Sequence, residues 1–465
     1  MKPILGDCAV VLGGSLAGLL TARVLAERFS TVVVVERDRL PDVPSSRRGV
    51  PQGNHIHGLL AGGQRAMEQL LPGLVQELAA AGVPVGDPLA DLRIRLNGHR
   101  FRQAPSGLTL VSASRDVLEH QVRQRVRSQP GVTLMDRCDV VGLAGGGDRL
   151  SGVRVLRRAD DSVEELLDAD VVVDATGRGS RAPVWLSDIG FPPPKEEQVR
   201  IDLGYTTRRY RLPLDALEGG LGVLQAPTPR HPRGAALAHL EDGVWMLTLI
   251  GLRGDHPPVQ VEEFDRFAES VGSDDISSLL AMAEPIDSPV AFRFPASTRR
   301  YYERTRLPVN LLVVGDSLCS FNPVYGQGMS VAALEAVAIA RKLAGGKLVP
   351  SRVVMGELAR IVDVPWRMAG GVDRAFLPAE KPPRRDRIMA AYVDRVQAAA
   401  EHDSVVGRGF LRVSGLIDPP GALLRPSLVW RTLRRSFTAH SGLPGSSPPE
   451  EPAVDLNQVR TRCSS

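Results

Sequence analysis

The sequence predicts an α/β protein in which a parallel-sheet domain is interrupted by an antiparallel sheet and followed by helices. Near the N-terminus, the strand-like run Val10–Leu12 leads through a glycine turn and an apolar helix to the β-branched run Thr31–Val35, which is typical of a strand buried on both faces of a parallel sheet. From about 195 to 300, alternating segments separated by Pro- and Gly-rich turns indicate antiparallel strands. Parallel-sheet character returns at Val309–Val314.

Length and composition exclude several classes of protein. The 465 residues are 43% apolar, which is enough for a large core divided between closely associated domains. The formal net charge is only +4, and the arginines are interleaved with acids, so no basic patch for nucleic acid is indicated. Four widely separated cysteines, Cys8, Cys138, Cys319 and Cys463, encode neither a disulfide framework nor a zinc site. We therefore expect a reducing, cytoplasmic location.

No segment has the features of a membrane span or a secretory signal. The apolar stretch from Cys8 to Ala26 imitates a signal peptide, but its internal glycines fit a strand, a tight turn and a helix better. Elsewhere no apolar run reaches the roughly 18 to 20 residues that a span needs.

Further helix signals occur at 63–81, 114–128 and 330–343, and strand signals at 132–135 and 170–174. These patterns predict a division of the chain into four parts. The parts are a discontinuous α/β domain (1–190 and 305–350), an inserted antiparallel sheet (191–304), a helical region (351–443) and a Ser- and Pro-rich disordered tail (444–465).

The first motif with chemical content is the glycine turn. Gly13 and Gly18, with Glu36 at the end of the second strand, form a dinucleotide fingerprint in which backbone amides and a helix N-terminus meet a pyrophosphate. Glu36 would hold ribose hydroxyls. Ser15 stands where the middle glycine is usual, so the backbone approaches the phosphate less freely.

The second motif lies about 300 residues later, at Gly315–Ser330. A strand places Asp316 at its carboxyl end, and a proline and two glycines then lead into a new helix whose amides can face an electron-rich ligand. This combination suits a flavin, because Asp316 can bind ribityl hydroxyls while amides near Gly328 and Met329 stabilise negative charge on the reduced ring.

Together the two motifs, with Asp174–Arg181 between them, resemble the class A flavoprotein monooxygenases of the para-hydroxybenzoate hydroxylase fold. More narrowly, Arg48–His57 and Phe321–Ser330 are similar to the actinobacterial branch that includes the flavin epoxidases of polyether biosynthesis. The resemblance implies a Rossmann-type FAD-binding domain, an inserted antiparallel-sheet substrate domain and C-terminal helices.

Carried over by position, the resemblance implies contacts with the pyrophosphate, the adenosine ribose, the ribityl chain and the flavin ring. The cofactor-binding residues that it implies are Gly13, Ser15, Gly18, Glu36, Arg37, Arg48, Arg115, Asp316, Gly326, Gly328 and Met329. Two departures matter. Asp174–Gly177 differs from the family's usual Asp-Gly, which weakens a nicotinamide-handling role, and Cys319 stands where a histidine is common.

The resemblance also implies the reaction. NADPH or NADH meets the flavin transiently, since no second nucleotide-binding unit is visible, and dioxygen then forms a flavin C4a-hydroperoxide that epoxidises or hydroxylates an electron-rich substrate. An FAD-dependent reductase or dehydrogenase of a prenyl or polyketide chain is the alternative, and a flavin-binding partner protein without turnover is a third hypothesis. A flavin halogenase is disfavoured because the chain has no Trp-x-Trp-x-Ile-Pro stretch.

No acid/base triad or metal constellation is evident, so the catalytic residues are unknown. His57, Pro323 and Tyr325 are the candidates beside the flavin, and His55 and His57 lack the further ligands that a metal would require. Cys319 fits a buried core residue better than a nucleophile.

The substrate would lie between the flavin, the inserted sheet and the C-terminal helices. The resemblance favours a lipophilic polyketide or terpenoid, free or bound to a carrier. Four arginines could bind a carboxylate or a carrier phosphate, although sheet packing or surface charge explains them as well: Arg208, Arg209, Arg293 and Arg299.

Overall fold

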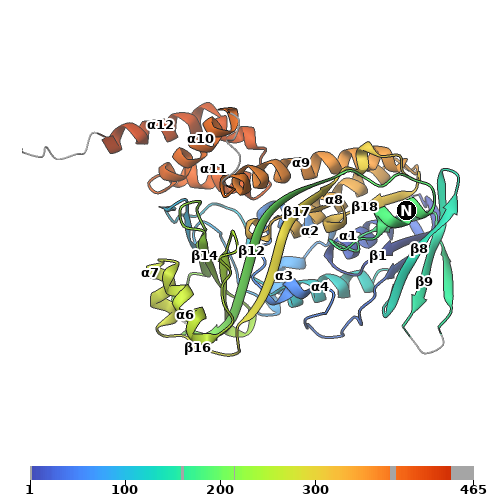
Figure 1. The fold of residues 1–465 in the computed structure, drawn as a ribbon, viewed down its shortest axis with the longest axis horizontal. Coiled ribbons are helices and arrows are strands. Elements are labelled where there is room, and N and C mark those ends of the chain that lie inside the picture. The colour runs from blue at the N-terminus through green and yellow to red at the C-terminus, as the bar shows by residue number, and fades with distance from the viewer. Residues whose placement is uncertain (1–2, 159–161, 214, 378–383, 441–465) are drawn as a thin grey trace, which may run out of the picture.

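The computed structural model describes residues 3–158, 162–213, 215–377 and 384–440. Figure 1 shows a parallel-sheet half on the right and an antiparallel-sheet half on the left, with long strands running between them and helices above both. The predicted mixed α/β class is confirmed.

A five-stranded parallel sheet forms the first half, in the order β18-β11-β1-β2-β7. Its strands are β1 (Gly6–Leu12), β2 (Phe29–Val35), β7 (Val132–Met135), β11 (Val171–Asp174) and β18 (Leu311–Val313). Because the strands are parallel, their carboxyl ends meet at one edge of the sheet. The glycine turn, Glu36, Asp174 and the Gly315 segment all follow strands at this edge.

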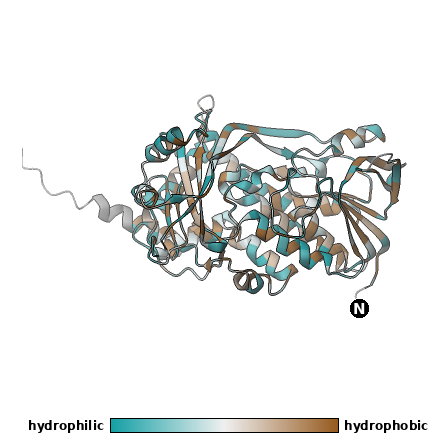
Figure 2. Ribbon diagram, turned by 90° about the horizontal axis from the view of Figure 1, so that it is seen from below, coloured by the Kyte–Doolittle hydropathy of each residue, from teal (hydrophilic) through white to brown (hydrophobic). Residues whose placement is uncertain are grey.

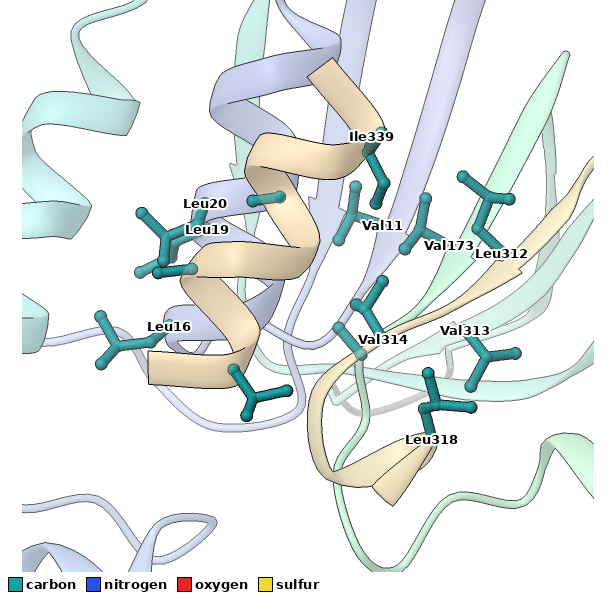
Figure 3. Packing of buried hydrophobic residues seen from close by; sticks show 14 of the residues in the cluster. Val11, Leu16, Leu19, Leu20, Val173, Leu312, Val313, Val314, Leu318 and Ile339 are labelled. Carbon is teal, nitrogen blue, oxygen red and sulfur yellow. The ribbon is translucent and has the colours of Figure 1, made fainter. Parts of the chain in front are cut away.

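Helices bury this sheet because each presents an apolar face to it. Leu16, Leu19 and Leu20 of α1 (Leu16–Leu25) and Ile339 of α8 (Gln327–Leu343) are almost inaccessible to solvent. Figure 3 shows Ile339 close to Val11 and Val173 of the strands, and Leu16, Leu19 and Leu20 on the other side of the helix. Complete burial of each such side chain stabilises the fold by about 1.5–3 kcal/mol. Figure 2 shows hydrophobic strands in this half beside helices whose outer faces are more hydrophilic.

Smaller elements complete this half. An antiparallel sheet of β8 (Cys138–Gly146), β9 (Arg149–Arg157) and β10 (Glu164–Asp168) flanks the parallel sheet, and β3 (Val85–Gly86) pairs with β6 (Leu110–Val111). The remaining elements are η1 (Pro51–Asn54), α2 (Ala61–Leu70), α3 (Leu74–Ala80), α4 (Arg115–Arg127), α5 (Ala182–Asp188), η3 (Tyr302–Arg304), η4 (Gly315–Ser317) and η5 (Pro323–Tyr325).

The second half is a nine-stranded mixed sheet with the main order β19-β17-β12-β15-β14-β13-β4-β5, to which β16 adds beside β12. Its strands are β4 (Leu92–Leu96), β5 (His99–Arg100), β12 (Glu196–Arg211), β13 (Gly222–Gln225), β14 (Arg233–His239), β15 (Val244–Gly251), β16 (Glu284–Pro285), β17 (Val290–Arg300) and β19 (Cys319–Ser320). The turn η2 (Glu241–Gly243) precedes β15, and α6 (Val261–Ser270) and α7 (Asp274–Leu280) pack on this sheet.

The C-terminal part is helical. α9 (Ser351–Ala375) runs along the parallel-sheet half, and α10 (Arg384–Ala400), α11 (Ser404–Ser414), η6 (Pro420–Leu424) and α12 (Pro426–His440) cluster above the antiparallel half (Figure 1). None of the helices in the described ranges has both the length and the hydropathy to cross a bilayer.

Some sequence-based expectations differ from the structure. The helix expected over 63–81 is two helices, because Pro72 and Gly73, with a φ of +86°, break it. The helix expected from 330 begins at Gln327. The antiparallel sheet takes β4 and β5 from the segment assigned to the first domain. The tail expected at 444–465 lies outside the described residues.

Candidate functional site

Gly13 and Gly18 allow a sharp turn between β1 and α1. Gly13 has a φ of +105°, and a Cβ there would lie 2.4 Å from the carbonyl oxygen of Ala175. A Cβ at Gly18 would lie 1.9 Å from the carbonyl oxygen of Gly13. A side chain at either position would force the backbone apart. The turn sets the first amides of α1, which none of the described side chains caps, at the carboxyl edge of the parallel sheet, a suitable place for a phosphate.

Ser15 connects this turn to α4. Its hydroxyl donates to Glu119 Oε2 at 2.7 Å and accepts from Arg115 Nη2 at 2.7 Å. Arg115 and Glu119 are one helical turn apart and form an ion pair of 3.1 Å. Burial favours the neutral acid, but the guanidinium groups of Arg115 and Arg47 outweigh it and lower the pKa of Glu119. Ser15 and Arg115, each predicted to bind the cofactor, are thus brought together through an acid that sequence reasoning missed.

Glu36 lies directly after β2 and is buried. Its Oε2 accepts the Gly14 amide at 2.8 Å, and its Oε1 accepts the Asp38 amide at 2.9 Å. Arg47 Nη1 lies 3.4 Å from Glu36 Oε2, and its Nε donates to Glu119 Oε1 at 3.0 Å. Glu36 is therefore held rigidly at the strand end, close to the glycine turn.

Arg47 joins Glu36 to Glu119 in this network, whereas the sequence analysis named Arg37 and Arg48 instead. Its side chain is 4% exposed. Burial disfavours its charge, but Glu119 and Glu36 outweigh this effect and raise its pKa. Arg37 and Arg48 are exposed, and their proposed FAD contacts stay predictions. No local pattern distinguishes Arg47 from Arg48, because only the paths of α4 and β2 bring their acids to it.

Asp316 follows β18 and lies near the glycine-turn network. Burial raises its pKa, while the positive charges of Arg115, Arg178 and Arg300 oppose the rise. Arg115 also donates a hydrogen bond to Ser15, so Ser15 and Asp316, about 300 positions apart in the sequence, lie near the same positive charge. The preceding Gly315 has a φ of +60° and donates its amide to Glu335 Oε2 at 2.7 Å. Glu335 thereby fixes the turn that carries Asp316.

The start of α8 is open toward Asp316. Gly326, with a φ of +64°, precedes the helix, and no side chain caps the first turn. Among the described residues, only Asp316 Oδ1 would lie within 4 Å of a Cβ at Gly328, at 3.7 Å. The amides of Gly328 and Met329 belong to this first turn, where backbone N–H groups lack helical partners. Pro323 and Tyr325 lie in η5, immediately before it.

His55 and His57 lie on a loop against this turn, since a Cβ at Gly326 would be 3.1 Å from the carbonyl oxygen of Gly58. His57 Nδ1 is 2.9 Å from the His55 carbonyl oxygen. Burial lowers the pKa of His57 to about 3, with a further contribution from the charge of Arg115, and burial lowers the pKa of His55 to about 4. Both imidazoles are neutral at pH 7. His57 is thus near enough to Arg115 to experience its charge.

A hydroxyl chain orients His55. Its Nδ1 is 2.7 Å from Thr207 Oγ1, which is 2.7 Å from Thr248 Oγ1, and Thr248 accepts the Ile56 amide at 3.2 Å. The ring lies between aromatic residues of β12 and β17, with centroids 6.0 Å from Tyr205 and 5.6 Å from Phe292. The nine-stranded sheet therefore supplies one wall beside the predicted flavin site.

Asp373 of α9 is a buried acid that sequence reasoning missed. Its Oδ1 accepts from the Tyr325 hydroxyl at 2.7 Å and from Asn322 Nδ2 at 2.8 Å. Burial raises its pKa to about 6, although the two donors oppose the rise. The candidate Tyr325 is thus tied to α9. The available signal was an acid in Gly370–Phe376, where the other residues except Arg374 are small or apolar.

Other residues considered in the sequence analysis have structural roles. Cys319 is buried in β19, and burial raises the pKa of its thiol well above the ordinary value, as expected for a core residue. Within the described ranges no three potential ligands among His, Cys, Asp and Glu come together as a metal site. Asp174 accepts from Thr176 and Ser180 hydroxyls at 2.6 Å each. It therefore fixes the loop that follows β11.

The chemistry of these groups fits FAD. Uncapped amides of α1 suit the pyrophosphate, the carboxylates of Glu36 and Asp316 suit ribose and ribityl hydroxyls, and the open first turn of α8 suits an electron-rich ring edge. Gly328 leaves open space where a side chain would otherwise project.

Comparisons with solved structures support this class of fold. The structure of the flavin-dependent brominase Bmp2 superposes with a TM-score of 0.66 at 14% identity, covering 94% of this chain and 100% of that chain. p-Nitrophenol 4-monooxygenase PnpA from Pseudomonas putida DLL-E4 gives a TM-score of 0.63 at 18% identity, covering 90% and 100%. The fold is that of the class A flavoprotein monooxygenases and halogenases.

Sequence comparison then gives the family. No family model matches the chain. Protein Rv3254 of Mycobacterium tuberculosis (strain ATCC 25618 / H37Rv) is 35% identical over 430 residues, covering 89% of this chain and 90% of that protein. The chain belongs to the same family as Rv3254. The narrower resemblance to the polyether epoxidases stays a prediction.

Proposed function

We propose that this protein is an FAD-dependent monooxygenase that uses NADPH or NADH and dioxygen to epoxidise or hydroxylate a lipophilic polyketide or terpenoid intermediate. One observation carries the proposal: the glycine turn with Glu36 and the Asp316 turn, far apart in sequence, follow strands at the same edge of one parallel sheet. An extended dinucleotide is a ligand long enough to use both.

The bound FAD would accept two electrons from the nicotinamide nucleotide and deliver them to dioxygen. For hydroxylation the balance is substrate–H + O2 + NAD(P)H + H⁺ → substrate–OH + H2O + NAD(P)⁺. Epoxidation consumes the same reagents and adds the oxygen atom across a C=C bond.

The chain's own residues bind, orient and shield in this proposal. The amides of α1 would hold the pyrophosphate, Glu36 the adenosine ribose, and Asp316 the ribityl chain. The amides of Gly328 and Met329 would stabilise negative charge at the ring edge. The aromatic side chains of Tyr205 and Phe292 would exclude water from the part of the site between the flavin and the nine-stranded sheet, which we call the ligand side.

The substrate is proposed to enter between this site and the antiparallel sheet, either free or bound to a carrier. The cysteines Cys8, Cys138 and Cys319 are free thiols, which is compatible with action in a reducing cytoplasm, where reduced nicotinamide nucleotides are present.

The test begins with the cofactor. The purified protein is expected to contain one FAD per chain, identified by its absorbance and by release on denaturation. Asp316→Ala should retain FAD less well, because each lost hydrogen bond is worth about 0.5–1.5 kcal/mol and more where charge assists. Asp188→Ala, which removes an exposed acid at the end of α5, is the matched control. Equal retention by all three proteins would show that Asp316 does not contact the cofactor.

The second step separates a monooxygenase from a dehydrogenase. NADPH or NADH should bleach the flavin absorbance anaerobically, and admission of oxygen should restore it within seconds with consumption of one O2 per flavin. A reduced flavin that persists in air would favour the reductase or dehydrogenase hypothesis. A flavin that neither nucleotide reduces would favour a binding protein without turnover.

A further inference from the structure

Asp373 has one carboxylate oxygen occupied and one free. It is 1% exposed, and its Oδ1 accepts both hydrogen bonds, from Tyr325 and Asn322. Its Oδ2 is buried and has no hydrogen-bond partner among the described residues. An ionised carboxylate can accept about four hydrogen bonds, so half of this group's capacity is unused.

A buried acceptor without a partner is costly, since leaving it unsatisfied costs about 1–3 kcal/mol and more for a charged group. Apolar packing would have avoided the cost at this position of α9. The buried acid therefore indicates a ligand whose hydroxyl or N–H group donates a hydrogen bond to Asp373 Oδ2 when it binds.

The surroundings of Asp373 belong to the ligand side of the site. Tyr325 lies in the turn before the open end of α8, and Tyr205 lies in the antiparallel sheet beside His55. Burial raises the pKa of Tyr205 well above the ordinary value, and the charge of Asp373 raises it further. The Tyr205 hydroxyl is therefore within electrostatic reach of Asp373. Aromatic rings and an acid, from three distant segments, converge there.

Three of the four sheet arginines that could bind an acidic ligand have partners elsewhere, as does Arg374 of α9. Arg208 donates to the Asp287 carbonyl oxygen at 2.9 Å, and Arg209 Nε donates to Asp287 Oδ2 at 2.6 Å. Arg299 donates to Glu303 at 3.1 Å, and Arg374 reaches Glu197 at 3.3 Å. The charged group that contacts Tyr325 and affects Tyr205 is the carboxylate of Asp373.

We propose that Asp373 is the polar anchor of the ligand side and that its Oδ2 accepts a hydrogen bond from a neutral hydroxyl or N–H group on an otherwise apolar ligand. The inference rests on the proposed function, because it assigns the ligand of that site. It also excludes a carboxylate as the ligand group at this position, since two like charges would meet without a cation between them.

The direct test uses probes of matched shape. The FAD-containing protein is titrated with 2-naphthol, 2-methoxynaphthalene and 2-naphthoate at pH 7.5, and binding is followed by the change in the flavin absorbance spectrum. Naphthol should bind at least about tenfold more tightly than the methoxy compound, which lacks the donor, and the carboxylate should bind most weakly.

Asp373→Asn tests whether the anchor is this side chain. The substitution keeps the shape but replaces one acceptor oxygen by an amide donor, so the preference for naphthol should fall to within about twofold. Asp188→Asn, at an exposed acid, should preserve it. Equal binding of naphthol and its methyl ether by the parent, or a preference unchanged in Asp373→Asn, would overturn the inference.

The pH dependence distinguishes direct contact from a structural role. Between pH 5 and 8, Asp373, whose pKa is about 6, is the titrating member of this group, since His55 and His57 have pKa values of about 4 and 3 and the tyrosines titrate far higher. The preference for naphthol should therefore be lost as the pH falls through about 6.

Tyr325→Phe should move that midpoint upward, because it removes a donor that stabilises the carboxylate. An unchanged midpoint would overturn the assignment. The FAD content measured first separates the two proposals: a protein without FAD contradicts the proposed function, whereas a protein with FAD but without a preference for naphthol contradicts only the role of Asp373.

Discussion

The cofactor side and the ligand side of the site are built differently. On the cofactor side, Gly13, Gly18 and Glu36 act through backbone geometry and a paired charge network directly after parallel strands. On the ligand side, His55 lies against Tyr205 of β12, and Asp373 of α9 accepts from Tyr325 and Asn322. Distant segments therefore build this side, and within the described residues His55 Nε2 and Asp373 Oδ2 have no hydrogen-bond partner.

The difference separates what must stay constant from what can vary. FAD would always present the same phosphates and hydroxyls, so a tight turn and a charge network that hold one geometry suit its side. A ligand that enters and leaves requires polar atoms that are unpaired when it is absent. Substitutions on the cofactor side should therefore affect folding and FAD content, and those on the ligand side should affect selectivity.

The largest effect is expected from Gly18→Val. Its Cβ would lie 1.9 Å from the Gly13 carbonyl oxygen, so the glycine turn would have to open. We expect loss of bound FAD and of the cooperative unfolding transition, measured by flavin absorbance and circular dichroism. Gly356→Ala is the control, because its Cβ meets nothing within 4 Å and alanine favours a helix by about 1 kcal/mol. A Gly18→Val protein with normal FAD and melting temperature would contradict the geometry of the turn.

Arg47→Ala should have the next largest effect. It leaves the buried Glu36 without the arginine that pairs with it, while Glu119 keeps Arg115 and Arg123. Breaking a buried pair costs about 3–5 kcal/mol, so we expect a loss near the lower end of that range. Arg48→Ala, at an exposed position, should change the free energy of unfolding by less than about 0.5 kcal/mol. Urea denaturation of both variants measures the contrast. Equal losses would place Arg48 in the network as well.

This pair of residues also shows where sequence reasoning reaches its limit. Gly13, Gly18 and Glu36 could be predicted because one strand, turn and helix place them locally. The choice between Arg47 and Arg48 depends on how α4 packs beside β2, and the partner of Tyr325 depends on α9, about 50 residues later. Such long-range contacts have no local pattern.

The fold shows the same limit. The mixed α/β class and the antiparallel block followed from hydrophobic periodicity. The pairing of β4 with β13 could not be predicted in this way, because Leu92–Leu96 pairs in parallel with Gly222–Gln225, which lies far along the chain. The break between α2 and α3 was signalled by Pro72–Gly73, but the apolar pattern continued through it.

A smaller, pH-dependent effect is expected at Glu335, whose pKa burial raises from 4.5 to about 8. The folded state favours the neutral acid, so its contribution to stability is complete below pH 4.5 and is lost as the pH rises through 8. Glu335→Gln stays neutral and can still accept the Gly315 amide. Relative to the parent, this variant should therefore gain stability between pH 5 and 8. Thermal unfolding across that range, with the exposed Glu269→Gln as control, checks the sign. A constant difference between parent and variant would contradict it.

The smallest effect on stability, and the sharpest on function, is expected at Gly328. In the protein itself a Cβ there meets only Asp316 Oδ1, at an ordinary contact distance of 3.7 Å. Gly328→Ala should therefore leave the melting temperature unchanged or slightly raised, since alanine favours a helix.

If the isoalloxazine occupies the open space, Gly328→Ala and more strongly Gly328→Val will crowd it and displace the amides that stabilise its negative charge. We expect the rate of flavin reduction by NADPH to fall at least about tenfold in the Val variant, with folding intact. Stopped-flow absorbance measures the rate, and Gly356→Ala serves again as the control. An unchanged reduction rate in Gly328→Val, with FAD still bound, would mean that the start of α8 is a structural connection and that the reactive edge of the flavin lies elsewhere.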